Sequence, residues 1–180
     1  MTDTDKANTQ LDHQQHQTSA NRLPICLLIN DLKDPLNIGS LFRLADSFNL
    51  DKIYLTGTSP TPPNPKIRKT ARHTDTFVDF SYNENALEVI HQLKNKHYQI
   101  ICLELSTQSI DINTLQPGCE QPICLIIGEE NAGVNQSLLD LSDLTIHIPM
   151  RGRNSSMNVS TATAIALYEL AKQFSPAISI

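Results

Sequence analysis

Short, nearly continuous apolar runs alternate with amphipathic stretches along this chain from Leu23 onward. Such runs are typical of strands buried on both faces, and their alternation with helical patterns favours a parallel sheet. We therefore expect an α/β fold, with a mostly parallel sheet and helices on both of its faces. The six expected strands cover residues 24–30, 52–57, 76–80, 98–105, 122–128 and 144–150.

Helices are expected between these runs. Asn37 is suited to cap a helix whose apolar side chains recur at helical spacing. Ser81 and Glu84 form a capping-box pattern before a second amphipathic stretch. The remaining segments are expected to be a short helix at 136–141, a long helix from about 158 to 174, and an exposed proline-rich loop at 57–65.

Composition indicates one domain. The chain has 180 residues, 39% of them hydrophobic, which is enough to bury an ordinary core. Residues 1–22 are polar and are expected to form a flexible tail, which leaves 23–180 as the domain. No apolar run resembles a signal peptide or approaches the roughly 20 residues that span a bilayer. We expect a cytoplasmic protein that does not enter a membrane.

The cysteines are expected to be reduced core residues. The four of them show no CxxC spacing, and Cys26, Cys102 and Cys124 lie inside apolar runs. A zinc site built from scattered cysteines and histidines is the less favoured alternative, because no pair has the spacing of a zinc finger. We expect no metal site.

The charge pattern sets a limit on partners. A net charge of −5 argues against indiscriminate nucleic-acid binding, although it leaves room for a local basic patch. One candidate patch follows the proline-rich loop, where charge alone favours an ordinary solvated surface. Its basic residues are Lys66, Arg68, Lys69 and Arg72.

Three segments place unusual loops at expected strand ends, where ligands collect in parallel sheets. The first, residues 30–48, reads NDLKDPLNIGSLFRLADSF, and Arg43 lies opposite the apolar stripe of its helix. The second, GEENAG at 128–133, does not match a Rossmann or Walker A loop. The third, IPMRGRNSSMNVSTA at 148–162, crowds small polar residues at a helix start. Taken singly, a solvated arginine, a turn and a helix cap would explain them.

Taken in order, these three motifs resemble those of the SpoU class of SPOUT RNA 2′-O-methyltransferases, also called the TrmH family. The resemblance covers nearly everything from Leu23 to the C-terminal helix and is greatest to TrmH-type tRNA guanosine methyltransferases. It implies an α/β fold whose C-terminal part forms a deep trefoil knot, which binds S-adenosylmethionine. It also implies a homodimer whose catalytic surface lies near the subunit interface.

The resemblance also implies roles for individual residues. Arg43 matches the catalytic arginine, which either accepts or relays the proton of the ribose hydroxyl or only orients the ribose and phosphate. Asn37 matches a residue that positions the arginine, and Glu130 matches an acidic residue expected to pair with it. Ser156 and Asn158 match the pair that holds the substrate and neighbouring loops.

Further positions are implied for the ligands. The expected S-adenosylmethionine contacts are Leu103, Leu105, Gly128, Ile148 and Met157, where Met157 replaces the commoner leucine. Arg151 and Arg153 are candidate phosphate contacts, and the basic run at 66–72 becomes a candidate RNA surface.

The reaction expected from the resemblance is methyl transfer from S-adenosylmethionine to a ribose 2′-hydroxyl of RNA, with tRNA as the favoured substrate. Ribosomal RNA is an alternative substrate. A non-catalytic RNA-binding relative and a small-molecule binding protein remain alternative functions.

Overall fold

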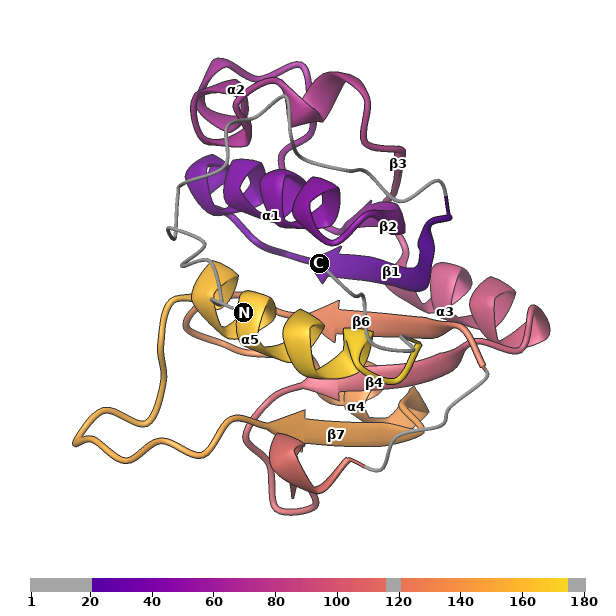
Figure 1. Ribbon diagram of the computed structural model, residues 1–180, viewed down its shortest axis with the longest axis vertical. Helices are drawn as coiled ribbons and strands as arrows, with labels where there is room; N and C mark the ends of the chain where they lie inside the picture. Colours follow the sequence, from indigo (N-terminus) through magenta and orange to yellow (C-terminus); the bar gives the residue numbers. More distant parts are fainter. Residues whose placement is uncertain (1–20, 116–120, 175–180) are drawn as a thin grey trace, which may run out of the picture.

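A seven-stranded parallel sheet forms the centre of the molecule (Figure 1). The computed structural model describes residues 21–115 and 121–174, so the expected tail at 1–22 lies almost entirely outside the described residues. The order of the strands across the sheet is β3-β2-β1-β6-β4-β7-β5. The strands are β1 (Leu23–Asn30), β2 (Leu50–Thr56), β3 (Phe80–Asn83), β4 (Gln99–Leu103), β5 (Ile110–Asp111), β6 (Ile123–Ile127) and β7 (Leu144–His147).

Helices cover both faces of the sheet, as the apolar runs predict. One face packs against α1 (Pro35–Ser47) and α5 (Val159–Ala171), and the other packs against α3 (Ala86–Asn95) and α4 (Gln136–Leu141). Alternate side chains of the central strands enter the two cores, so that Leu27 lies under α1 while Cys26 and Leu28 lie under α3. The expected α/β fold class is confirmed.

The three cysteines of the expected strands are buried in the core under α3 and α4. Burial raises the pKa of the Cys102 thiol to about 11. The neighbouring Cys26 and burial together raise the pKa of Cys124 well above its ordinary value. Cys102 and Cys124 are therefore protonated at neutral pH and pack as small apolar groups.

Two helix starts differ from the expected ones. The first helix begins at Pro35, and Asp34 rather than Asn37 caps it by accepting a hydrogen bond from the Leu36 N–H. Proline at the first helical position loses no hydrogen bond, which allows this earlier start. The capping box predicted before α3 was also wrong, because Ser81 lies in β3 and the Asn85 side chain caps the helix.

The region between β2 and β3 holds the largest errors of the sequence prediction. The expected strand at 76–80 is wrong, because Thr74–Thr76 form a 3₁₀ turn, η2, and the strand begins only at Phe80. A helix that the sequence prediction missed, α2 (Pro65–Ala71), carries the basic run. Asn64 caps it with two hydrogen bonds and Pro65 opens it, a helix-start signal hidden among the surrounding prolines.

A long irregular segment, residues 148–158, connects β7 to α5 and extends away from the sheet (Figure 1). Within residues 21–115 and 121–174, no helix is both long enough and apolar enough to cross a membrane.

Candidate active site

Three side chains that are far apart in the sequence form a hydrogen-bonded chain at the carboxyl edge of the sheet. The Asn158 amide nitrogen donates to Asn37 Oδ1 over 3.0 Å, and the Asn37 amide nitrogen donates to Glu130 Oε1 over 2.8 Å. Each residue comes from a different one of the three sequence motifs. The fold therefore brings together in space what the sequence showed only as an order along the chain.

Secondary structure fixes the two asparagines. Asn37 lies in the first turn of α1, directly after the helix start. Asn158 caps α5: its Oδ1 accepts from the Ser160 N–H at 3.0 Å and the Thr161 N–H at 3.3 Å. Because the Asn158 oxygen is committed to the cap, its amide nitrogen is the group that faces Asn37. One side chain thus joins the start of α5 to the start of α1.

Arg43 is exposed on α1, on the side away from the core. The structure does not show the expected pairing of Arg43 with Glu130 within the described residues, since the Glu130 carboxylate accepts from Asn37 instead. From Asn37 to Arg43 is six steps of helix, a rise of about 9 Å along the axis. Among the residues that the structure describes, the guanidinium has no ion pair or hydrogen bond, so it remains available to a ligand.

A tight turn after β6 carries Glu130. Glu129 and Gly133 pair across it as an isolated antiparallel bridge, and Gly133 has φ = 70°. A Cβ on Gly128 would lie 2.1 Å from the Gly133 carbonyl oxygen, so only glycine lets the two backbones approach this closely. The turn is the structural reason for the spacing of the GEENAG motif.

Glu104, which the sequence analysis did not identify, holds this turn from the neighbouring strand end. Its Oε2 accepts from the Val134 N–H at 3.0 Å, and its Oε1 accepts from the Leu105 N–H at 2.8 Å. A Cβ on Gly133 would lie 2.3 Å from the Glu104 carboxylate. The only signal in the sequence was a carboxylate directly after an apolar run, which is too common to single out.

The turn forms one wall of a cavity of about 780 Å³ at the ends of β4, β6 and β7, which we call the β4/β6/β7 cavity. The described residues that line it include Glu104, Glu129 and Glu130 but no lysine or arginine. Apolar side chains supply much of the remaining wall. All five of the expected cofactor contacts line it, together with three of the expected catalytic residues: Leu103, Leu105, Gly128, Ile148, Met157, Glu130, Ser156 and Asn158.

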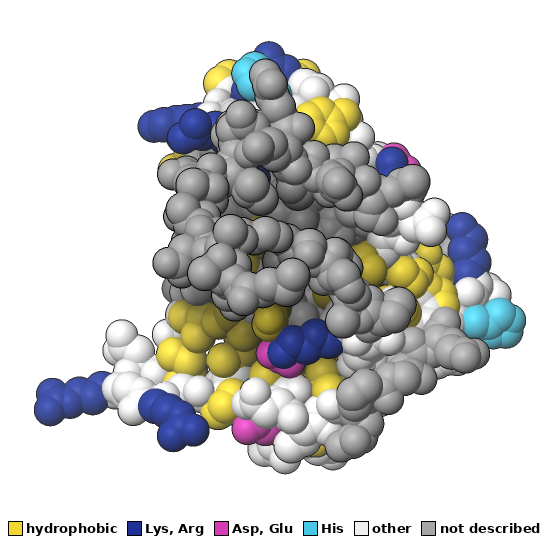
Figure 2. Space-filling model, viewed as in Figure 1, with side chains coloured by type: hydrophobic (Ala, Val, Ile, Leu, Met, Phe, Trp, Pro, Cys, Tyr) yellow, Lys and Arg dark blue, Asp and Glu magenta, His cyan; other side chains and the backbone are white. Residues whose placement is uncertain are grey.

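The basic run lies on α2, which is docked against α1. The Thr70 hydroxyl donates to the Leu36 carbonyl over 2.8 Å, and a Cβ on Gly39 would lie 2.2 Å from the Ile67 carbonyl oxygen. Figure 2 shows basic side chains over α2 and again over the extended segment before α5. The exposed basic residues on these segments are Lys66, Arg68, Lys69, Arg72, Arg151 and Arg153, of which Arg68 pairs with Asp75 at 3.6 Å.

Among residues 21–115 and 121–174, no group of three or more His, Cys, Asp or Glu side chains is placed to hold a metal ion. The fold and the site together define a parallel α/β protein with a cavity at the carboxyl ends of its strands, beside the hydrogen-bonded side chains of Asn37 and Asn158. The comparisons with known proteins agree with this class. The model of the SpoU rRNA Methylase family matches residues 24–168. The chain belongs to this family.

Two curated relatives show how far the similarity extends. An uncharacterized tRNA/rRNA methyltransferase of Borreliella burgdorferi is 31% identical over 82% of this chain and 63% of its own length. The tRNA (guanosine(18)-2′-O)-methyltransferase of Escherichia coli is 27% identical over 84% of this chain and 63% of its own length. This chain thus spans less than two thirds of the length of either relative.

Solved structures agree with the fold. An AdoMet-bound rRNA methyltransferase from Sinorhizobium meliloti superposes with a TM-score of 0.77 at 25% identity, covering 83% of this chain and 56% of that one. The TrmH/SpoU tRNA modifying enzyme of A. aeolicus has a TM-score of 0.75 at 24% identity, covering 84% of this chain and 76% of that one.

Proposed function

We propose that this protein transfers a methyl group from S-adenosylmethionine to a ribose 2′-hydroxyl of RNA, with tRNA as the favoured substrate and ribosomal RNA as the alternative. The observation that carries the proposal is the Asn158–Asn37–Glu130 chain of hydrogen bonds beside the β4/β6/β7 cavity. The family and the names of the relatives support it.

The lining of the β4/β6/β7 cavity fits S-adenosylmethionine. This cofactor carries a positive sulfonium, which agrees with a lining that includes three glutamates, although one of them, Glu129, is paired with Lys33 at 3.3 Å. Leu103, Leu105, Ile148 and Met157 would enclose the adenine, and the backbone around Gly128 would offer it hydrogen bonds. When bound, the cofactor supplies an electrophilic methyl group.

The chain's own residues would position the ribose and handle its proton. A ribose hydroxyl is a weak nucleophile until its proton is removed or polarised. Arg43 would contact the phosphate and the ribose, and in that setting it accepts or relays the proton, or it only orients them. Asn37 would position Arg43, and Ser156 and Asn158 would hold the substrate and the neighbouring loops, so that the geometry exists before the substrate arrives.

The test is methyl transfer by the purified chain from labelled S-adenosylmethionine to unmodified tRNA and, separately, to ribosomal RNA. Label in one pool, recovered as an alkali-resistant 2′-O-methyl nucleotide, is the expected result. Arg43→Ala should lower the rate about 100-fold or more while cofactor binding persists. Arg22→Ala is the matched control, because Arg22 directly precedes β1 and so lies at the amino end of the strands, away from the site. Cofactor binding without label in either pool would favour a non-catalytic RNA-binding protein.

The basic surface of α2, with Arg151 and Arg153, would hold the phosphate backbone of the RNA. Replacing Lys66 and Lys69 by alanine should weaken RNA binding and reduce the slope of log affinity against log salt by about 1.5 to 2, because each lost phosphate contact contributes nearly one. Lys96→Ala is the control, since this lysine is exposed at the end of α3. An unchanged slope would remove α2 from the RNA surface.

The proposal includes a homodimer, a C-terminal trefoil knot and a cytoplasmic site of action. Exposed Ile165 and Tyr168 on α5, at 38% and 59% of their full accessible areas, support the dimer because they leave apolar surface on a helix that packs beside α1. Sedimentation equilibrium is the measurement that checks it, and a monomer at micromolar concentration would contradict it.

A further inference from the structure

A second cavity lies at the point where the fold changes direction. The chain leaves β1 for α1 on one face of the sheet and leaves the adjacent β6 for α4 on the other face. Loops that diverge in this way open a crevice at the carboxyl ends of the strands, the place where open α/β sheets bind ligands. The crevice here has a volume of about 550 Å³, within the roughly 300–1,000 Å³ of small-ligand sites. We call it the β1/β2/β3 pocket.

A network of hydrogen bonds builds the floor of this pocket around Asp31. Asp31 has φ = 56°, and its Oδ1 accepts from the Thr58 N–H at 2.9 Å and from the Thr58 hydroxyl at 3.1 Å. Its Oδ2 accepts from the Asn30 amide at 2.7 Å and from the Asn135 amide at 3.4 Å. The hydrogen bond from the Thr58 N–H is the largest of the effects that hold the Asp31 pKa below its ordinary value. The floor is therefore negatively charged at neutral pH.

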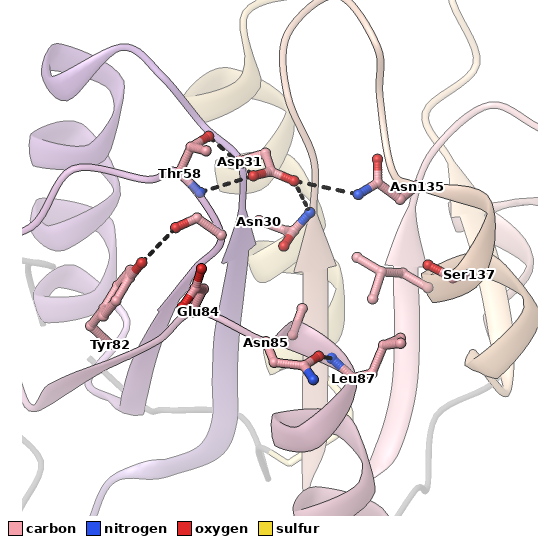
Figure 3. A pocket seen from close by; sticks show the side chains of 12 residues that line it. Asn30, Asp31, Thr58, Tyr82, Glu84, Asn85, Leu87, Asn135 and Ser137 are labelled. Atoms are coloured by element: carbon pink, nitrogen blue, oxygen red, sulfur yellow. Dashed lines mark hydrogen bonds between the residues drawn. The ribbon is translucent and has the colours of Figure 1, made fainter.

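The rim offers groups that are free to bind. Figure 3 shows Glu84 and Ser137 on opposite sides of the opening, with Asn30 between them. In the part of the chain that the structure describes, the Glu84 carboxylate and the Ser137 hydroxyl have no hydrogen-bond partner. The described lining residues include no lysine or arginine. The pocket thus suits a ligand group rich in N–H donors and disfavours a phosphate.

An aromatic ring stands at one side. The Tyr82 hydroxyl donates to the Gly57 carbonyl over 2.8 Å, which anchors the edge of the ring, while half of the residue remains exposed. An anchored, exposed ring beside hydrogen-bonding groups is the arrangement that proteins use to stack and read an unpaired base.

We propose that the β1/β2/β3 pocket binds an unpaired guanine of the RNA. Guanine has two adjacent donors, N1–H and the exocyclic amino group, which match the two oxygens of one carboxylate, here Glu84. Its carbonyl oxygen accepts from Ser137 or from the Asn135 amide, and its ring stacks on Tyr82. The inference rests on the proposed RNA substrate and adds to it a site that selects a base.

The test measures the affinity of the full chain for labelled pentaribonucleotides by fluorescence anisotropy. Saturating S-adenosylhomocysteine fills the β4/β6/β7 cavity, so that a base cannot bind there. The sequences UUGUU, UUIUU, UUAUU and UUUUU differ only at the central base, and inosine lacks the exocyclic amino group. UUGUU should bind about tenfold more tightly than each of the others, the effect of one good hydrogen-bonded contact.

Variants identify the pocket. Tyr82→Ala should weaken UUGUU about tenfold or more through loss of stacking, whereas Tyr82→Phe keeps the ring and most of the affinity. Glu84→Gln should remove the preference for guanine over inosine, because an amide cannot accept both donors. Phe77→Ala is the matched control, since this ring is 61% exposed outside the pocket.

Equal affinity for all four sequences, no binding of any of them, or a preference for guanine over inosine that survives Glu84→Gln would overturn the inference. Methyl transfer to intact RNA separates the two proposals. If transfer occurs but the pentanucleotides show no preference, the pocket proposal fails alone. If the guanine preference is present without transfer to any RNA, the proposed methyltransferase activity fails and the pocket stands.

Discussion

The two cavities at the carboxyl edge of the sheet are built in opposite ways. The β1/β2/β3 pocket is built around the charged carboxylate of Asp31, which accepts hydrogen bonds from residues at or just after the ends of the neighbouring strands. The β4/β6/β7 cavity is formed by close backbone approach at two glycines and by a long irregular segment before α5. The first depends on polar side chains, whereas the second depends on backbone shape and apolar cover.

This difference indicates which kind of substitution would disrupt each cavity. A site made by backbone approach fails when atoms are added, because the neighbouring backbone has no room to yield. A site made by hydrogen bonds fails when a donor replaces an acceptor, even if the shape is unchanged. The Asn158–Asn37–Glu130 chain of hydrogen bonds is sensitive to both kinds of change, since it depends on its donors and acceptors and also joins the glycine turn to two helix starts.

The largest effect is expected from Gly128→Ala. The added Cβ would lie 2.1 Å from the Gly133 carbonyl oxygen, so the turn must open. We expect a loss of about 3 kcal/mol in the free energy of unfolding, and cofactor affinity should fall more than tenfold. Denaturant unfolding and calorimetric titration measure these quantities. Gly152→Ala, where the added Cβ would meet no described heavy atom within 4 Å, is the control. Equal cofactor affinity in both variants would refute the role of backbone approach.

An intermediate effect is expected from Asn37→Ala, which removes the link between Glu130 and Asn158. Because the bridge is exposed, we expect only about 1 kcal/mol of lost stability, together with a 10- to 100-fold slower methyl transfer. Asn95→Ala, on the exposed end of α3, controls for the loss of an amide.

A double-mutant cycle sharpens this measurement. If Asn37 acts through Glu130, Asn37→Ala combined with Glu130→Ala should slow the reaction little more than either change alone. Fully additive losses would mean that the two residues act independently.

The smallest effect is expected from Asp31→Asn, which keeps the shape of the β1/β2/β3 pocket. The new amide places a donor against either Thr58 or the Asn30 and Asn135 amides, costing about 1 kcal/mol after solvent screening. Asparagine also tolerates the positive φ. Cofactor affinity in the other cavity should not change.

The pH dependence of stability tests whether the effect of Asp31→Asn comes from the lost charge of Asp31. Because folding lowers the Asp31 pKa, its charge stabilises the protein above the unfolded pKa of about 3.9 and loses this effect as the pH falls through the lower folded value. The stability difference between the wild type and Asp31→Asn should therefore shrink with acidification. A difference that stays constant from pH 7 to pH 3 would contradict an ionic origin.

Much of the layout of the sheet could be predicted from the sequence because buried parallel strands leave continuous apolar runs. The short helix α4 was predicted with its observed bounds. The strand expected at 76–80 failed because Phe77 is exposed, so an apolar run there reflects a surface turn and not a buried strand. Local composition does not distinguish these two cases.

The candidate site, like the fold, could be predicted from the sequence only in part. The resemblance predicted that Asn37 positions Arg43 and that Glu130 pairs with Arg43, whereas the described residues show Asn37 joined to Glu130 and to Asn158. Pairwise contacts of this kind depend on helix rotation, which a motif does not encode. Asp31, Thr58 and Tyr82 escaped the sequence analysis, since they become neighbours only when three strands align. The roles of the site residues in catalysis and RNA binding stay predictions.

The docking of α2 on α1 has a consequence for how a long polymer would be handled. With Thr70 bonded to Leu36 and no side chain at Gly39 to separate the helices, α1 and α2 form one rigid body. The spacing between Arg43 and the basic residues of α2 is therefore fixed. Under the proposed function, an RNA bound by α2 would present to Arg43 the nucleotide that lies at this distance from the bound phosphates, so that position along the strand, and not sequence alone, would decide which nucleotide reaches Arg43.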